Sequence, residues 1–577
     1  MKRLALGLAL ALLPLAGAAQ GLLVGVVRDQ DGAVVSGARI VGRDASGREA
    51  GSAIAGPDGT FALTASGVTS VDVGCDYCLA LRGIAPASPL VVLIMRFGAL
   101  ALAVPNDRDL AALPYARAEN AAALQPFTFT AGPGNLSFGL DRERGLISTA
   151  GIAFYRISDG GNALTSLPDR YLERLITLAP AQGYRYGDYA DAGTFDIEPL
   201  ADERIGLRLD GGPAESVAAR YATAGLAAAV GESYGSGIRQ ARADVVGTSS
   251  FMGGTLHSIA SLAGSGSETY SALGLQYATA SRRYETYVDA NAVRSTSNPT
   301  GPGSAEATGS AFFTDVRVRN RGPVQLEFGG RFRSSNGHYA APYYLYQSSG
   351  LQQEAALYTD LSFSAAGNTL QAAAGLTHIF RNQYGYFGPD TTVAPIGSLA
   401  YAYAFGPHFT FTAGGSALPR VPTLAEAGRY AFYAHALLPV DRDELFQSGF
   451  SYTDRSRIST EIAVFRERIA GAGTSVDAGA GISLAWQIAP ELALRAWSMQ
   501  PSQSLAAPYV FYAPAALPRT SSVWLTYDRF VRFDAIYYGG RIDGDVNFPV
   551  ARDTIFRVGR DSSSGSPLYS FGLRYVR

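Results

Sequence analysis

Residues 312–333 read FFTDVRVRNRGPVQLEFGGRFR, and this stretch carries the pattern that decides the fold. Side chains of an extended strand point alternately to two faces, so the stretch separates into an apolar face and a charged face. The apolar face carries Phe312, Thr314, Val316, Val318, Val324, Leu326, Phe328 and Phe332, and the charged face carries Asp315, Arg317, Arg319, Gln325, Glu327, Arg331 and Arg333. With a turn at Asn320–Pro323, the pattern predicts an antiparallel hairpin.

Two kinds of protein contain such hairpins. A soluble sandwich buries the apolar face and leaves the charged face in water, whereas a transmembrane barrel turns the apolar face to lipid and lines its lumen with the polar one. The alternation continues from about Arg204 to the end of the chain, with long strands expected at Thr269–Arg282, Arg283–Ser295 and Leu370–Arg381. Their length, beyond the usual 5 to 6 residues or so, and the aromatic residues near strand ends favour the barrel.

The composition narrows the classes of function. The 577-residue chain is 47% hydrophobic but only 17% charged, and it contains 66 Gly, 32 Tyr and 28 Phe. Gly-rich and Tyr-rich sequences with few helix formers favour many strands joined by tight turns. The formal net charge of -2 provides no basic excess to neutralise phosphates, so we do not expect nucleic acid as a partner.

The first 19 residues have the features of a secretory signal peptide. Lys2 and Arg3 precede an apolar run at Leu4–Leu15, and small residues follow, with cleavage expected after Ala18 or Ala19. An uncleaved anchor helix is the alternative, but the apolar run is short for spanning a bilayer. No later segment is apolar for the roughly 20 residues that a membrane helix needs. A mature chain in a membrane would therefore have to be a closed barrel.

Residues 20–97 are expected to form short strands separated by glycine turns. The expected strands are Leu22–Arg28, Ala38–Val41 and Thr60–Thr64, and Asp-Gly pairs between such strands indicate hairpins. Turn and strand residues follow in the order Gly25, Asp31, Gly32, Val35, Gly37, Ala38 and Asp58–Phe61. With these residues the segment resembles the carboxypeptidase regulatory-like domain, and this resemblance implies a β-sandwich.

Cys75 and Cys78 are the only cysteines of a chain that is expected in an oxidising compartment. In a straight strand, residues three apart face opposite sides at about 10 Å, which is too far for a disulfide. Either residues 75–78 form a turn that carries a disulfide, which we predict, or the two thiols stay free. A zinc site would need two more ligands, and the sequence places none nearby.

Residues 134–199 combine short strands, glycine turns and a short helix with Ser166 as its expected N-cap. Strands are expected at Ile152–Ile157 and Leu175–Leu178. A set of residues with a recognisable order runs through it: Asp159, Gly160, Leu172, Glu173, Arg174, Leu175, Pro180, Tyr186, Gly187, Ala190 and Gly193. With these residues at matching places, the stretch resembles the plug domain of TonB-dependent outer-membrane receptors.

Two further stretches resemble the same receptors. Phe409–Glu426 looks like the strand that ends in their Pro-Thr-Leu-x-Glu loop, and Leu568–Arg577 resembles the C-terminal assembly signal, with aromatic and apolar residues on one face but Arg577 in the place of the usual final aromatic. The resemblance implies about 22 strands. At ~10 residues a strand, only about 7 residues remain for each connection, so the loops should be short.

The expected organisation is mainly β. Its parts are a signal peptide at 1–19, a carboxypeptidase regulatory-like β-sandwich at 20–97, a linker at 98–120, a small α+β plug domain at 121–202 and an antiparallel transmembrane β-barrel at 203–577. The resemblance implies that the linker holds a TonB box, reached by the TonB–ExbB–ExbD energy-coupling complex. The expected box is Ala99, Leu100, Ala101, Leu102, Ala103 and Val104.

The sequence offers little enzymatic chemistry. Gly231–Gly235 matches G-x-S-x-G, but that motif acts at a strand–turn–helix corner and here lies among expected hairpins, so we do not expect an enzyme. The 5 histidines show no metal-ligand pair at helical spacing, and we expect neither a metal nor a cofactor. His435 lies about where haem-uptake receptors of the family hold haem, although an exposed loop histidine is the alternative. With Tyr184, Tyr186 and Tyr189 it is a candidate ligand contact.

These patterns lead to two hypotheses of function. The first is a monomeric receptor in the outer membrane of a Gram-negative bacterium that imports a large nutrient, such as an iron-siderophore or an oligosaccharide, by energy from TonB. The second is a surface-binding or adhesion barrel whose plug does not open, which short loops favour.

Overall fold

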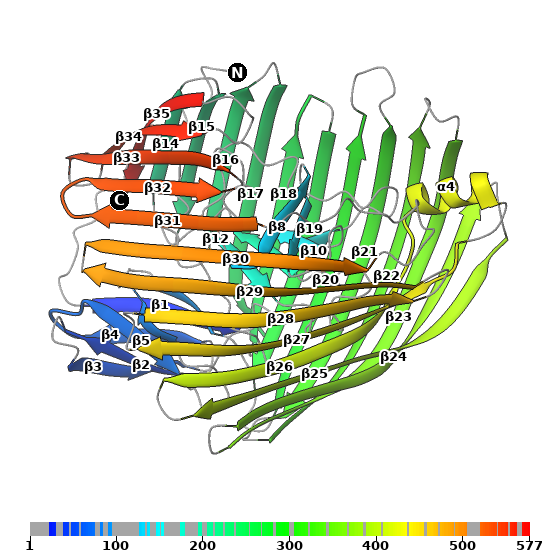
Figure 1. Cartoon of the computed structure of the whole chain (residues 1–577), viewed down its shortest axis with the longest axis horizontal. Helices are drawn as coiled ribbons and strands as arrows, with labels where there is room; N and C mark the ends of the chain where they lie inside the picture. The colour runs from blue at the N-terminus through cyan, green and yellow to red at the C-terminus, as the bar shows by residue number, and fades with distance from the viewer. Residues whose placement is uncertain are drawn as a thin grey trace.

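We describe the chain from a computed structural model. Three parts follow one another: two small sheets before residue 95, further small sheets between residues 126 and 198, and a closed barrel from residue 205 onward (Figure 1). The described residues are 22–29, 38–44, 48–56, 59–74, 81–84, 90–94, 126–132, 135–138, 146–149, 152–154, 174–178, 194–198 and, apart from residues 505–519, 562–567 and most turns, 205–576.

The N-terminal part consists of two sheets with the strand orders β4-β1-β7 and β3-β2-β5-β6. Strand β1 pairs antiparallel with β4 and parallel with β7, as in Val26 opposite Thr60 and Val91. The strands are β1 Leu22–Asp29, β2 Arg39–Arg43, β3 Glu49–Ile54, β4 Thr60–Thr64, β5 Ser70–Gly74, β6 Leu81–Ile84 and β7 Leu90–Ile94. Each of the three strands expected here from the sequence is present within about two residues.

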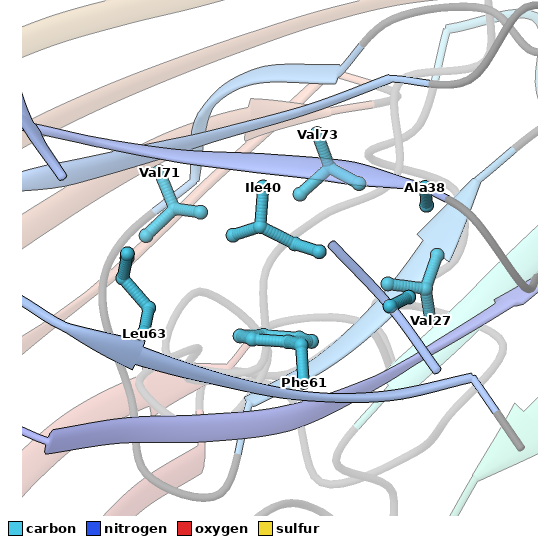
Figure 2. Packing of buried hydrophobic residues seen from close by; sticks show 8 residues of the cluster. Val27, Ala38, Ile40, Phe61, Leu63, Val71 and Val73 are labelled. Carbon is cyan, nitrogen blue, oxygen red and sulfur yellow. The ribbon is translucent and has the colours of Figure 1, made fainter. Parts of the chain in front are cut away.

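A hydrophobic core lies between these two sheets. The strands alternate buried and exposed residues, and their buried side chains point into one interior (Figure 2). The core consists of Val27, Ala38, Ile40, Ala55, Phe61, Leu63, Val71 and Val73. At its edge Arg43 donates from Nε to Asp72 Oδ2 at 2.5 Å, and this hydrogen bond raises the pKa of the guanidinium. The arrangement is a sandwich, as the sequence predicts.

Two small sheets follow between residues 126 and 198. Strands β8 and β9 form a hairpin, and the second sheet has the order β11-β10-β13-β12. The strands are β8 Thr128–Gly132, β9 Asn135–Phe138, β10 Leu146–Thr149, β11 Ile152–Phe154, β12 Arg174–Leu178 and β13 Thr194–Glu198. Strand β11 is shorter than the predicted Ile152–Ile157, and β12 matches its prediction closely. Strand β11 contacts β19 and β20 of the barrel, and Figure 1 shows this sheet in the space that the barrel strands enclose.

The barrel closes through 22 antiparallel strands, the number that the family resemblance implies. The last strand pairs with the first, with Leu207 opposite Tyr575. The strands are β14 Ile205–Gly211, β15 Ala214–Ala222, β16 Leu226–Gly235, β17 Ile238–Phe251, β18 Gly254–Gly264, β19 Glu268–Ala280, β20 Tyr284–Ser297, β21 Glu306–Asn320, β22 Val324–Ala341, β23 Tyr346–Ala365, β24 Asn368–Tyr384, β25 Asp390–Phe405, β26 Phe409–Arg420, β27 Asp441–Asp454, β28 Ile458–Ala470, β29 Thr474–Ala489, β30 Leu492–Ser504, β31 Thr520–Asp528, β32 Arg532–Tyr538, β33 Arg541–Ala551, β34 Thr554–Asp561 and β35 Leu568–Val576.

The barrel turns its apolar face outward. In β21 and β22, Val316 is 45% and Phe328 is 57% exposed, whereas Asp315, Glu327 and Arg331 are at most 4% exposed. The hairpin predicted at residues 312–333 is therefore present with the polarity of a transmembrane barrel rather than that of a soluble sandwich. Strand β35 follows the same rule, because Tyr569, Phe571 and Leu573 point outward, as its one-sided pattern predicts.

Several connections between barrel strands are very short. Residues 212–213, 236–237 and 539–540 each join two strands at the end of the barrel opposite its first and last residues. The longest described connection at that end is residues 421–440, which contain the helix α4 Leu424–Ala434. The Pro-Thr-Leu-x-Glu segment, predicted as a loop, thus begins a helix. Among the described residues, no helix is long and apolar enough to cross a membrane.

Candidate functional site

The inner wall of the barrel is lined by paired charges on β22–β24. Arg331 donates to Glu354 at 2.5 Å, and both side chains are at most 2% exposed. The same carboxylate accepts a hydrogen bond from Thr377 Oγ1 at 3.2 Å. Because the register places these strands side by side with matched parity, the two charges meet across neighbouring strands. A buried charge costs several kcal/mol unless it is paired in this way, so the pair stabilises this part of the polar wall.

A second buried cluster lies on β17–β19. Arg242 is fully buried and donates from Nε to Asp244 at 2.8 Å and from Nη2 to Ser261 at 2.9 Å. Its guanidinium lies over the ring of Tyr270, 5.4 Å from the ring centroid. The cation is held on several sides, which offsets its loss of hydration. Arg242 therefore belongs to the buried polar lining of the barrel.

The opposite wall, on β31–β34 and β14, is organised by aspartates. Asp534 accepts from Trp524 Nε1 at 2.8 Å and from Thr526 at 2.7 Å, and pairs with Arg532 at 2.8 Å. Arg557 pairs with Asp210 at 3.3 Å, and so joins the last part of the barrel to its first strand. These polar groups give the lumen its hydrophilic lining and close the barrel at the same time.

Phe127, directly before β8, packs against the inner wall on β28–β30. The side chain is 2% exposed, and its ring lies edge-on to Phe465 at 5.4 Å and to Trp497 at 6.4 Å between centroids. A Cβ at Gly481 would overlap the ring, so only glycine leaves room for it. Phe127 has φ of 60°, a conformation that costs a bulky residue free energy. The packing of its ring therefore offsets local strain. We call Phe127 with Phe465, Gly481 and Trp497 the Phe127 seat.

The helix α4 lies against β22 and β23 at one end of the barrel. Leu424 packs on Gly350, which has the inward parity of buried Ser348, so the helix lies against the lumen side of β23. Thr423 caps the helix: its Oγ1 accepts from the amide of Glu426 at 3.1 Å, and the Glu426 carboxylate accepts from the amide of Thr423 at 2.8 Å. After the helix, Leu438 lies near the wall, because its carbonyl oxygen accepts a hydrogen bond from Arg381 of β24 at 2.8 Å.

Most of the residues that the sequence singled out lie outside the described residues. These are Cys75, Cys78, Ala99, Leu100, Ala101, Leu102, Ala103, Val104, Asp159, Gly160, Glu173, Pro180, Tyr184, Tyr186, Gly187, Tyr189, Gly193 and His435. Arg174 is described: it begins β12, opposite Glu198 of β13. The roles assigned to these residues stay predictions.

The G-x-S-x-G match lies on a barrel strand. Ser233 belongs to β16, where its hydroxyl donates to Gln240 at 3.3 Å, and the chain there runs straight rather than turning into a helix. The geometry differs from a nucleophile elbow, as the sequence indicates. Within the part of the chain that the structure describes, there is no group of three or more potential ligands that could hold a metal ion.

Comparisons with known proteins match the structure and not the sequence. No family model matches the chain, and no curated protein matches it. The solved alcaligin outer-membrane receptor FauA from Bordetella pertussis has a TM-score of 0.66 at 10% identity, over 82% of this chain and 94% of that one. The chain has the fold of TonB-dependent outer-membrane receptors.

Two further receptor structures extend this likeness. The copper transporter OprC has a TM-score of 0.67 at 11% identity, over 82% of this chain and 99% of that one. The ferric citrate transporter FecA in its unliganded form has a TM-score of 0.66 at 11% identity, over 83% of this chain and 97% of that one. A closed barrel with an apolar exterior and a polar lumen satisfies its backbone in lipid, and this receptor fold is an outer-membrane fold.

The seat and the cap of α4 are the parts of the receptor fold that sequence reasoning missed. The Thr423-x-x-Glu426 spacing is a capping-box signal and would have predicted the start of α4. Phe127 carries no such signal, because its partners are more than 300 residues away in the chain and its positive φ is not typical of phenylalanine.

Proposed function

We propose that the chain is an energy-coupled outer-membrane importer of a large nutrient, with iron–siderophore complexes as the substrate class. The observation that carries the proposal is a closed 22-strand barrel whose interior holds part of its own chain, seated at Phe127. A barrel filled in this way is closed to large solutes unless the inner segment moves. In this account residues 121–202 are the plug, and the end that carries α4 faces outside.

The energy for that movement comes from outside the chain. The outer membrane holds no nucleotide pool, and the fold is that of receptors coupled to TonB. We therefore assign residues 99–104 as the TonB box, reached from the periplasm by the TonB–ExbB–ExbD complex. Tyr184, Tyr186, Tyr189 and His435 are the proposed ligand contacts. The solved proteins of the same fold include an alcaligin receptor, a ferric citrate transporter and a copper transporter, and this supports a metal complex as cargo.

A second candidate is a barrel that binds a ligand at the surface and does not open. The connections at residues 212–213, 236–237 and 539–540 favour it, because they leave little chain to enclose a ligand. An importer of oligosaccharides is a variant of the first proposal with another cargo. The three hypotheses differ in what accumulates inside the cell: a ferric complex for the first, an oligosaccharide for its variant, and neither for the surface-binding barrel.

The proposal is tested by uptake. The protein is produced in cells that lack their own siderophore receptors, and these receive radiolabelled ferric complexes of a hydroxamate, a catecholate and an α-hydroxycarboxylate, or a labelled oligosaccharide. We expect one ferric complex to accumulate, and only in cells with TonB. Surface binding without accumulation would support the second candidate instead, and accumulation of the oligosaccharide alone would replace the substrate class.

A further inference from the structure

Three arginines lie together on the outer surface of β27 and β28, at the end of the barrel near α4. Arg442, Arg466 and Arg468 are exposed and have the same outward parity as Ile462. Glu444 lies between two of them and pairs with Arg442 at 3.0 Å and with Arg468 at 3.1 Å. Three arginines and one glutamate give this outer arginine cluster a net charge of +2.

Arg466 is the member nearest the apolar belt. It lies opposite Phe446 on β27 and two residues from Val464, both of which point to lipid. Among the described residues, none forms a hydrogen bond or ion pair with Arg466. Two residues along a strand correspond to about 7 Å, so Arg466 and Arg468 are close like charges at the edge of a low-dielectric region. The lumen arginine Arg331, by contrast, is paired with a carboxylate.

The surface on both sides of the cluster carries small apolar side chains. Ala417 on β26 lies opposite Glu444, and Ala478 on β29 lies opposite Arg466, so both flanking strands present small side chains. Below the arginines, Phe446, Ile462 and Val464 continue the apolar belt and are roughly half exposed. Cations above apolar side chains, with small residues at both sides, match a ligand that has an anionic head and acyl chains.

We propose that the outer arginine cluster binds the phosphate groups of a phosphorylated lipid of the outer leaflet. Guanidinium groups form paired, charge-assisted hydrogen bonds with phosphate oxygens, and long arginine side chains reach the headgroup level from the edge of the apolar belt. The acyl chains then lie along Phe446, Ile462 and Val464. The inference rests on the proposed function only for the orientation of the barrel, since lipid binding requires no transport.

The test measures lipid binding to the purified full chain in detergent by native mass spectrometry. The probes are lipid A with two phosphate groups and the same lipid after enzymatic removal of both phosphates. We expect the phosphorylated lipid to bind at least tenfold more tightly, and this preference to shrink as ionic strength rises. Equal binding of the two lipids would overturn the proposal, whether or not the chain imports anything.

Variants locate the site. We expect the double variant Arg466→Gln with Arg468→Gln to lose the preference for the phosphorylated lipid. Arg294→Gln is the matched control and should keep the preference. Arg294 is an exposed outward arginine of β20, and the residues opposite it on β19 and β21 are the uncharged Ser271 and Ser310. Heat-modifiable gel mobility shows that each variant has folded. If the double variant does not fold, Arg466→Gln alone replaces it and should lose most of the preference. A double variant that keeps the tenfold preference would also overturn the proposal.

Discussion

Replacement of Phe127 by alanine should release the chain before β8 from the barrel wall. The ring is 2% exposed and packs edge-on against two aromatic rings. Truncation of a buried phenylalanine costs about 3–5 kcal/mol, and the edge-on pairs account for part of this. The positive φ opposes seating by about 1–3 kcal/mol and remains when alanine replaces phenylalanine. The seat should therefore open at least ~100-fold more often, since ~1.4 kcal/mol is a factor of ten.

Hydrogen exchange measures this opening. Amides of residues 126–138 should exchange roughly 100-fold faster in Phe127→Ala, while amides of the barrel strands keep their protection. Phe127→Gly should exchange more slowly than Phe127→Ala, because glycine adopts positive φ without strain. Exchange equal to that of the unaltered chain in both variants would refute the reasoning.

The barrel side of the same contact gives an independent check. Gly481→Ala places a Cβ where the ring of Phe127 lies and should raise exchange in residues 126–138 without any change in that segment. Gly264→Ala is the matched control, because the nearest atom to a Cβ there is 3.9 Å away, and we expect no effect. If both glycine variants behave alike, the ring does not depend on the space at Gly481.

Three further predictions concern the wall, the helix and the exterior. Thr423→Ala removes the cap of α4 and should lower the stability of the helix by about 1 kcal/mol. Hydrogen exchange in the helix should then be about fivefold faster. Unchanged exchange would contradict the capping role. Arg331→Ala leaves Glu354 buried without its cation and should cost about 3–5 kcal/mol, seen as a lower temperature of the gel-mobility transition, whereas Arg331→Met with Glu354→Gln should recover most of the loss. Ile462→Arg places a charge on the lipid face and should cost about 2–4 kcal/mol in refolding into lipid vesicles, and no cost would contradict lipid contact there.

The sequence predicts the barrel well because one physical rule repeats in it. Alternation of apolar and polar residues at 312–333 fixes two faces, and length with aromatic placement indicates which face meets lipid. The expected number of strands rests on the family resemblance. Turns as short as residues 212–213 hardly interrupt the alternation of apolar and polar residues, so periodicity alone does not separate one strand from the next. The candidate site was less predictable. Phe127 depends on contacts with Phe465 and Trp497, which local pattern does not encode.

The helix α4 shows an intermediate case. The capping box is a local signal, so the start of the helix is predictable from residues 423–426. Its place on the inner wall is not readable, because that depends on the space at Gly350 on a strand about 70 residues earlier.

The central claim is that a pull on the linker moves the inner segment and so admits the cargo. The most direct test is Leu102→Pro, because proline removes an amide donor and fixes φ, and so blocks strand pairing with TonB. In cells with TonB, we measure surface binding and accumulation of whichever ferric complex the unaltered receptor accumulates. We predict that accumulation is lost and binding is unchanged. Accumulation that persists in Leu102→Pro and in cells without TonB would contradict the claim and leave a passive channel.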